Sequence, residues 1–211
     1  MDKKILTLLL GAATASTVTM AQTPAFPGAE GHGRYVTGGR GGEIRHVTNL
    51  NDKGTGSLRE AVKGNTKKIV VFDVGGVVAL ASNLTIGDNT TILGQTAPGN
   101  GITVRYYTVN PGSNNIIRFL RIRRGQERDV NDGADASTQR HKTGIIFDHC
   151  SFSWGLDETF SINPDNKGTK PQLITISNTI MGQGLLTHSA GGLMQSDSIT
   201  LYRNLYCDNA T

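Results

Sequence analysis

From Lys68 onward the chain alternates between short apolar segments and clusters of Gly, Asn, Asp and Pro. The apolar segments are too short for helices, and they are typical of β-strands bounded by turns. Five of them share one strand pattern, and their central residues are separated by 25, 30, 29 and 25 positions: Ile92, Ile117, Phe147, Ile176 and Leu201.

A β-repeat of this length without intervening helices predicts a solenoid, in which each turn stacks on the last and buries a shared apolar column. A β-sandwich also contains many short strands. Sandwich strands, however, are not expected to keep one pattern in register over five turns. The sequence therefore predicts an all-β fold, a right-handed parallel β-helix, over residues 22–211.

A short helix is expected ahead of the repeat. Ser57 is followed three residues later by Glu60, which is the spacing of a capping box, and Leu58, Ala61 and Val62 share one helical face. One amphipathic helix at the start of an otherwise β chain is expected to cap the end of the core.

The glycine-rich stretch 25–42 has no phosphate-loop motif, and no strand–turn–helix unit frames it. We expect turns there that let one backbone pass close to another. The stretch 43–50 alternates like a strand.

Residues 1–21 have the features of a secretory signal peptide. Lys3 and Lys4 precede an apolar run at 5–13, and small residues ending at Ala21 form a cleavage site. The apolar run is too short to span a membrane. We therefore expect a mature protein that begins at Gln22, is secreted or periplasmic, and has no membrane span.

The charge is mild, with a formal net value of +4, and the basic residues are scattered along the chain. This distribution disfavours nucleic acid and supports only a weak attraction to polyanions. Cys150 and Cys207 are the two cysteines. They either pair or remain free, and buried free thiols are the favoured interpretation.

One segment carries a family signature. Residues 147–162, FDHCSFSWGLDETFSI, resemble the strand–turn–strand signature of the pectate lyases of polysaccharide lyase family 1. The run from FPGAEGHGR to SLREAV, residues 26–62, is also similar to the N-terminal part of the bacterial enzymes. The resemblance implies the same β-helix and calcium-dependent β-elimination of an acidic plant polysaccharide, pectate. We expect a monomer.

A polar insertion at 123–142 contains candidate calcium ligands, since calcium takes several oxygen ligands in flexible geometry. It does not have the spacing of an EF-hand loop, and a solvated charged loop is the alternative. Stacking of successive turns would bring Asp135 close to Asp157. By the resemblance, Asp135 matches the upstream calcium ligand and Asp157 the first downstream one, with Asp132 and Glu158 able to assist.

Three departures from the family pattern stand out. Ser161 occupies the position where many members carry a second downstream aspartate. The loop 186–192 lacks the family's substrate-binding lysine, which leaves His188 as its basic candidate. The catalytic arginine is expected beyond Thr211, so the chain resembles an N-terminal portion, incomplete at its C-terminus, and no catalytic residue is assigned.

Two other functions therefore stay open. A non-catalytic β-solenoid could bind acidic polysaccharide or act as a surface adhesin. A glycoside hydrolase on the same fold would need a pair of positioned carboxylates and no metal.

Overall fold

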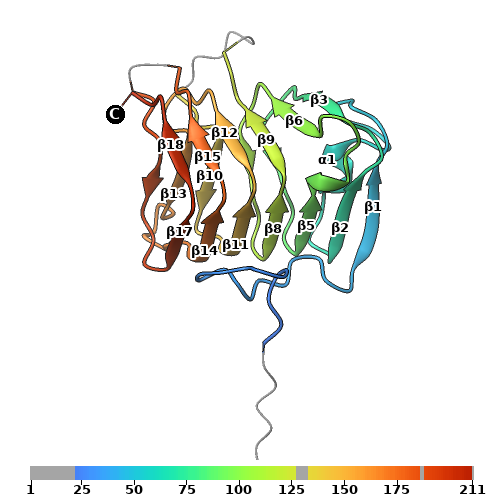
Figure 1. The fold of residues 1–211 in the computed structure, drawn as a ribbon, viewed down its shortest axis with the longest axis horizontal. Helices are drawn as coiled ribbons and strands as arrows, with labels where there is room; N and C mark the ends of the chain where they lie inside the picture. Colours follow the sequence, from blue (N-terminus) through green and yellow to red (C-terminus); the bar gives the residue numbers. More distant parts are fainter. Residues whose placement is uncertain (1–21, 127–132, 186–187, 211) are drawn as a thin grey trace, which may run out of the picture.

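The computed structural model describes residues 22–126, 133–185 and 188–210, which form a parallel β-helix (Figure 1). The predicted β-solenoid is therefore confirmed. The signal peptide expected at 1–21 and the candidate ligand Asp132 lie outside the described residues. Within those residues, no helix has the length and apolar character that a membrane span requires.

Each turn from β2 to β16 contributes strands to three faces, and all strand pairs are parallel. Sheet A consists of β1 (Glu43–Val47), β2 (Lys68–Phe72), β5 (Thr90–Leu93), β8 (Asn115–Arg118), β11 (Thr143–Asp148), β14 (Gln172–Ser177) and β17 (Ile199–Tyr202). Sheet B consists of β3 (Gly76–Ala79), β6 (Ile102–Arg105), β9 (Leu120–Arg123), β12 (Ser151–Ser153), β15 (Ile180–Gly182) and β18 (Leu205–Cys207).

The third face has two pieces, joined where the Val109 amide donates to the Ala136 carbonyl at 3.1 Å. Its strands are β4 (Leu84–Thr85), β7 (Val109–Asn110), β10 (Ser137–Arg140), β13 (Phe160–Asn163) and β16 (Leu193–Met194). A 3₁₀ turn, η1 (Gly94–Thr96), follows β5. Successive side chains of a strand point to opposite sides. On the third face, one set therefore points into the core, and the other points outward, where it can contact a ligand.

The predicted repeat is confirmed residue by residue in sheet A. Phe147 is paired with Ile117 on one side and with Ile176 on the other. Because inward side chains of stacked strands share one column, these residues form the apolar core. The column begins one turn earlier than the sequence indicated and runs through Val70, Ile92, Ile117, Phe147, Ile176 and Leu201.

From β8 onward, sheets A and B meet at a sharp corner formed by one residue per turn in the left-handed backbone region. Phe119 and His149 occupy successive corners with φ of 56° and 53°. The His149 ring stacks on the Phe119 ring, with centroids 4.8 Å apart and planes 16° from parallel.

A buried carboxylate lies directly beside this corner. The Asp148 side chain, which is 2% exposed, forms an ion pair with Arg118 at 2.7 Å. It also accepts hydrogen bonds from the Ser177 hydroxyl at 2.9 Å and the Asn178 amide at 2.8 Å, and it contacts Nδ1 of His149 at 2.8 Å. Although burial by itself would raise the pKa of Asp148, the hydrogen bonds from Asn178, His149, Arg118 and Ser177 lower it below its ordinary value.

The predicted capping helix is present as α1 (Leu58–Ala61), at the β1 end of the solenoid (Figure 1). The Ser57 hydroxyl accepts a hydrogen bond from the Glu60 amide, as expected of an N-cap. Leu58, Ala61 and Val62 are buried in the main core.

The glycine-rich stretch 25–42, here called the strap, crosses the outer face of sheet A (blue in Figure 1). Its amides donate to threonine hydroxyls of three strands, from Gly39 to Thr91, from Gly33 to Thr175 and from His32 to Thr200. A second apolar cluster joins the strap to sheet A, with Val36 of the strap packed against Ile116 and Ile146. The close backbone approach expected of these glycines is confirmed.

Alanine at position 39 is expected to lift the strap from sheet A. An added Cβ would lie 1.8 Å from the carbonyl oxygen of Lys68, which is backbone and cannot move aside. We expect Gly39→Ala to lower the free energy of unfolding by about 2 kcal/mol, the scale of overpacking. The measurement is denaturant unfolding. Gly28→Ala, whose Cβ meets nothing within 4 Å but sits at a φ of 85°, is expected to cost about 1 kcal/mol; equal effects of the two variants would contradict the steric argument.

Two further expectations meet the structure here. Cys150 and Cys207 are both free, but Cys150 alone of the two is buried as expected, and its burial raises the pKa of its thiol to about 12. The predicted polar insertion at 123–142 is shorter than expected, because residues 137–140 near its end form strand β10. Ser137 and Gln139 point inward there, and the Ser137 hydroxyl donates to the Val109 carbonyl at 2.6 Å. Because the inward residues of this strand are polar, its sequence lacks the apolar alternation by which strands were predicted.

Candidate metal centre and its groove

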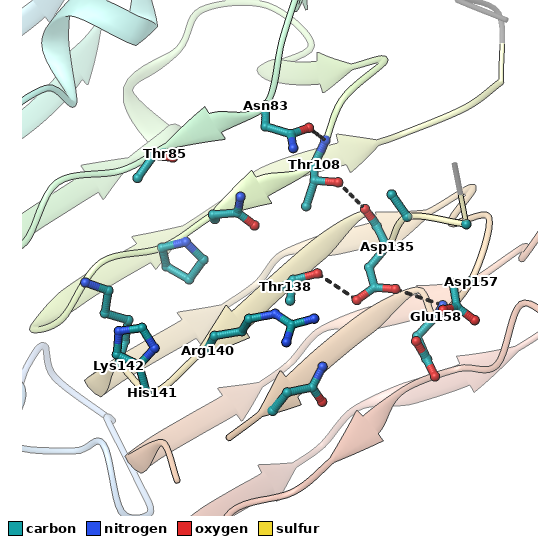
Figure 2. Close-up of a pocket in the computed structure, with 15 residues that line it drawn as sticks. Asn83, Thr85, Thr108, Asp135, Thr138, Arg140, His141, Lys142, Asp157 and Glu158 are labelled. Carbon is teal, nitrogen blue, oxygen red and sulfur yellow. Dashed lines mark hydrogen bonds between the residues drawn. The ribbon is translucent and has the colours of Figure 1, made fainter. Parts of the chain in front are cut away.

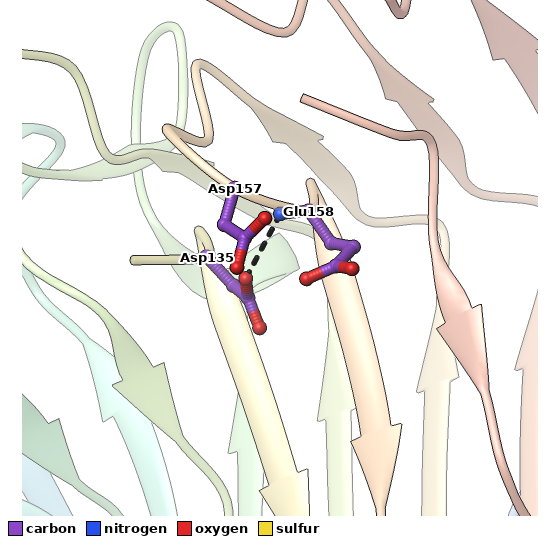
Figure 3. A group of neighbouring side chains, drawn as sticks. All are labelled: Asp135, Asp157 and Glu158. Carbon is purple, nitrogen blue, oxygen red and sulfur yellow. Dashed lines mark hydrogen bonds between the residues drawn. The ribbon is translucent and has the colours of Figure 1, made fainter. Parts of the chain in front are cut away.

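Three carboxylates from two consecutive turns converge on the third face (Figure 3). Asp135 lies just before β10, and Asp157 and Glu158 lie just before β13. Because β10 and β13 pair in parallel, the residues before them come together. One oxygen of each carboxylate lies within 4.8 Å of the others.

Hydrogen bonds hold two of the three side chains in place. Asp135, which is 7% exposed, accepts from the Thr138 hydroxyl at 2.7 Å and from the Glu158 amide at 3.0 Å. The Ser161 hydroxyl donates to the Glu158 carboxylate at 3.2 Å. Ser161, the residue that departs from the family pattern, thus contacts a carboxylate three residues earlier.

The third carboxylate is only partly satisfied. Oδ1 of Asp157 is buried and accepts no hydrogen bond from the described residues. Nε2 of His188 lies 3.5 Å from the same oxygen, which makes an ion pair only when that ring is protonated. A buried, unsatisfied carboxylate oxygen is costly without a partner. A set of oxygen donors with an unsatisfied member fits a hard cation such as calcium.

The electrostatics agree with the geometry. Burial, followed by the negative charges of Asp135 and Asp157, raises the pKa of Glu158 above its ordinary 4.5. Three carboxylates this close repel one another when all are ionised, and a bound cation would remove that repulsion.

This shift predicts how stability depends on pH. A carboxyl whose pKa is raised in the folded state contributes its full stability below its ordinary value of 4.5, and this is lost as the pH rises through the folded-state pKa. In a calcium chelator, the melting temperature should therefore fall across that window, and added calcium should reduce the fall. Glu158→Gln should lack this component in the chelator; an unchanged profile in that variant would contradict the assignment.

The carboxylates lie at one end of a groove of about 470 Å³ across the third face (Figure 2). Thr85, Asn110 and Thr138 are outward residues of successive strands that line it. Arg140, His141 and Lys142 also line it, and Figure 2 shows His141 and Lys142 at the end away from the carboxylates. The groove therefore combines an acidic end, a row of hydroxyl and amide groups, and a basic end.

The structure brings together three of the four predicted metal ligands, Asp135, Asp157 and Glu158. His188, predicted to bind substrate, is 86% exposed beside Asp157. Sequence reasoning missed the groove residues Thr138 and Arg140, although alternation along the polar stretch 137–140 would have placed both outward. Trp154 is half-buried, with the Arg105 guanidinium 5.3 Å from its ring centre.

Curated proteins with similar sequences carry a single name. The chain is 48% identical over 206 residues to probable pectate lyase C of Aspergillus fumigatus, covering 96% of this chain and 47% of that protein. It is 53% identical over 190 residues to probable pectate lyase C of Aspergillus terreus, covering 89% and 43%. The chain thus spans about half the length of the curated relatives it matches.

The fold has a solved counterpart. The crystal structure of Jun a 1, the major allergen from cedar pollen, matches with a TM-score of 0.61 and 23% identity, covering 72% of this chain and 49% of that one. This match concerns the fold alone. No protein-family model matches the chain. The sequence identity of about half over nearly the whole chain makes it closely similar to the matching part of these pectate lyases.

Proposed function

We propose that the protein is a secreted, calcium-dependent pectate lyase, and that this chain carries the calcium site and part of the substrate groove. The observation that carries the proposal is the set of three carboxylates from consecutive turns, within 4.8 Å of one another in a groove. The similarity to pectate lyases supports the reaction class. The sequence of residues 1–21 supports secretion.

In this proposal Asp135, Asp157 and Glu158 supply the ligands of a cation that the substrate shares. A uronate is a poor carbon acid because the proton at C5 lies beside an anionic carboxylate. Calcium, when bound, would neutralise that carboxylate and stabilise the charge that develops as the proton leaves. Thr138 and Ser161 keep two of the ligands oriented, which matters because oriented ligands need no reorganisation during the reaction.

The reaction is an elimination across two carbons of one sugar. A base takes the C5 proton, the electron pair forms the C4–C5 double bond, and the C4–O bond breaks, so the leaving sugar takes up a proton at its oxygen. We assign no described residue as the base. His188, next to Asp157, is proposed as a substrate contact at the acidic end of the groove.

The proposal is tested by calcium-dependent binding of oligogalacturonate to the chain, followed by calorimetry. We expect calcium and oligogalacturonate each to tighten the binding of the other, because an ion that both ligands share couples their affinities reciprocally. Binding that is equally tight in a calcium chelator would contradict a bridging ion and favour a calcium-independent binder. Where polygalacturonate is cleaved, ultraviolet absorbance of the unsaturated product separates elimination from hydrolysis.

A further inference from the structure

Stacking of successive turns gathers three arginines on the outer face of sheet B, which contributes no residue to the groove (Figure 1). Arg121 and Arg123 are alternate residues of β9, and both point outward because Leu120 and Ile122 are buried in the core. Arg105 of β6 is in direct register with Arg123. Basic residues that are scattered along the sequence therefore meet on one surface, and we call Arg105, Arg121 and Arg123 the arginine patch.

No carboxylate in the described part of the chain neutralises Arg121 or Arg123. Their hydrogen bonds go to backbone carbonyls and hydroxyl groups. None of the six strands described for sheet B contains Asp or Glu. Burial lowers the pKa of the Arg123 guanidinium below its ordinary value, and the positive charge of Arg121 lowers it further. The arginine patch thus carries unbalanced positive charge, which attracts an anionic ligand.

The neutral hydrogen-bond partners hold both guanidinium groups in place. Nε of Arg121 donates to the Thr103 hydroxyl at 3.0 Å, and its Nη2 donates to the Asn100 carbonyl. Nη1 of Arg123 donates to the Ser151 carbonyl at 2.9 Å, and its Nη2 donates to the Ser151 hydroxyl at 2.8 Å. A guanidinium has five N–H donors, so each group keeps donors for a ligand. Because the two side chains are already oriented, binding orders them at little entropic cost.

The arginine patch lies in the middle of an open and extended surface. Outward residues of the six strands form one column in register: Val77, Thr103, Arg121, Ser151, Ile180 and Leu205. Toward the ends of this column, Val77, Ile180 and Leu205 are 48%, 45% and 54% exposed. Since neighbouring strands lie about 4.8 Å apart, the column is about 24 Å long. It therefore fits an extended ligand that is acidic at its centre and packs against apolar side chains toward its ends.

A strand of an acidic polysaccharide has these properties. Each uronate ring carries a carboxylate, which matches the planar fork of a guanidinium, and a face of C–H groups, which packs against apolar side chains. A small anion such as phosphate would contact the arginines alone, and it would use neither the length of the column nor its apolar ends.

We propose that the arginine patch binds the carboxylates of an unesterified uronan strand that is separate from any strand in the groove. The choice of polymer rests on the proposed function. The site needs no calcium, because the arginines themselves supply the positive charge. By holding the protein on the polymer, it raises the effective concentration of uronan at the groove.

The test measures retention of the chain on immobilised polygalacturonate at low ionic strength in a calcium chelator. We expect wild type to be retained weakly, and retention to fall as added salt screens the charges. The double variant Arg121→Gln/Arg123→Gln should bind about tenfold more weakly or less, the loss expected for a charge-assisted contact. Fully methyl-esterified polygalacturonate, which lacks the carboxylates, should retain neither protein.

Two further variants isolate the site. Arg34→Gln/Arg40→Gln removes the same charge from exposed positions of the strap, on sheet A, and should be retained within about twofold of wild type. Arg121→Gln alone keeps Arg123 and its contacts with Ser151, so it tests the site even where the double variant does not fold. It should weaken retention about threefold or more. Denaturant unfolding checks that each variant is folded.

The outcomes separate this inference from the proposed function. If wild type is not retained in the chelator, or if the folded patch variants are retained as strongly as wild type, the site is refuted. Equal losses in the strap variant would assign the attraction to net charge and also refute it. In each of these cases, binding that calcium restores leaves the proposed function standing. If the patch variants lose retention but calcium adds no binding to wild type, the site stands and the proposed function fails.

Discussion

Asp148→Asn is expected to lower the free energy of unfolding by about 3 kcal/mol, the scale for breaking a buried ion pair from one side. The Asp148 side chain is 2% exposed and Arg118 is 19% exposed, so the substitution leaves a mostly buried guanidinium without its counter-ion. The donors Ser177 and Asn178 also lose a charged acceptor. Denaturant unfolding of the two proteins measures the difference.

The pH dependence of this difference is a second readout. A carboxyl whose folded-state pKa is lowered contributes stability that is present above its ordinary value of 3.8 and lost as the pH falls through the folded-state pKa. The gap between wild type and Asp148→Asn should therefore close in acid. His149→Ala, which removes a 47% exposed ring from the same carboxylate, should cost much less. A gap that stays constant down to strongly acidic pH would show that shape, not charge, is what the site requires.

Asp157→Asn is expected to weaken calcium binding by about 100-fold or more, because affinity in oxygen-ligand sites follows the number of charged ligands. The amide keeps the shape of the side chain but removes the charge at a buried carboxylate oxygen that has no hydrogen bond from the described residues. Without calcium, the variant should be at least as stable as wild type, since one of three mutually repelling charges is gone. Calcium titration by calorimetry and thermal unfolding in a chelator measure the two effects.

The matched control is Asp197→Asn. Asp197 is an exposed aspartate that pairs with Lys170 at 2.7 Å, outside the groove. Exposed ion pairs contribute little to stability. Both calcium affinity and stability should therefore stay near the wild-type values. Loss of calcium binding in this control, or its retention in Asp157→Asn, would mean that the ion binds elsewhere.

The sequence predicted the apolar column well because each turn repeats one alternation of inward and outward residues. Ile117, Phe147 and Ile176 occupy equivalent places, and parallel pairing without a register shift is the arrangement that buries all of them together. The same stacking rule predicted that Asp135 and Asp157 would meet. Once the turns are aligned, residues just before successive strands of one face have to be neighbours.

Other features could not be predicted because polar contacts, not apolar alternation, define them. Ser137 and Gln139 point into the solenoid at β10, where hydrogen bonds replace apolar burial. Asp148 is the charged residue of an otherwise apolar strand. That position was the sequence feature that could have indicated its buried hydrogen-bond network. Its partners Arg118 and Ser177 are 30 and 29 residues away in sequence. The path of the strap depends on contacts that span most of the chain.

The strap has a consequence for the order in which the protein folds during synthesis. The His32 amide bonds to the Thr200 hydroxyl, 168 residues later in the chain. At translation rates of roughly 5–20 residues per second, Thr200 is synthesised about 10 to 30 s after the strap. During that interval the earlier turns can stack, while the outer face of sheet A remains uncovered. The N-terminal stretch of the chain is thus among the last to reach its final place, and its closure reports that the turns from β2 to β17 have assembled in register.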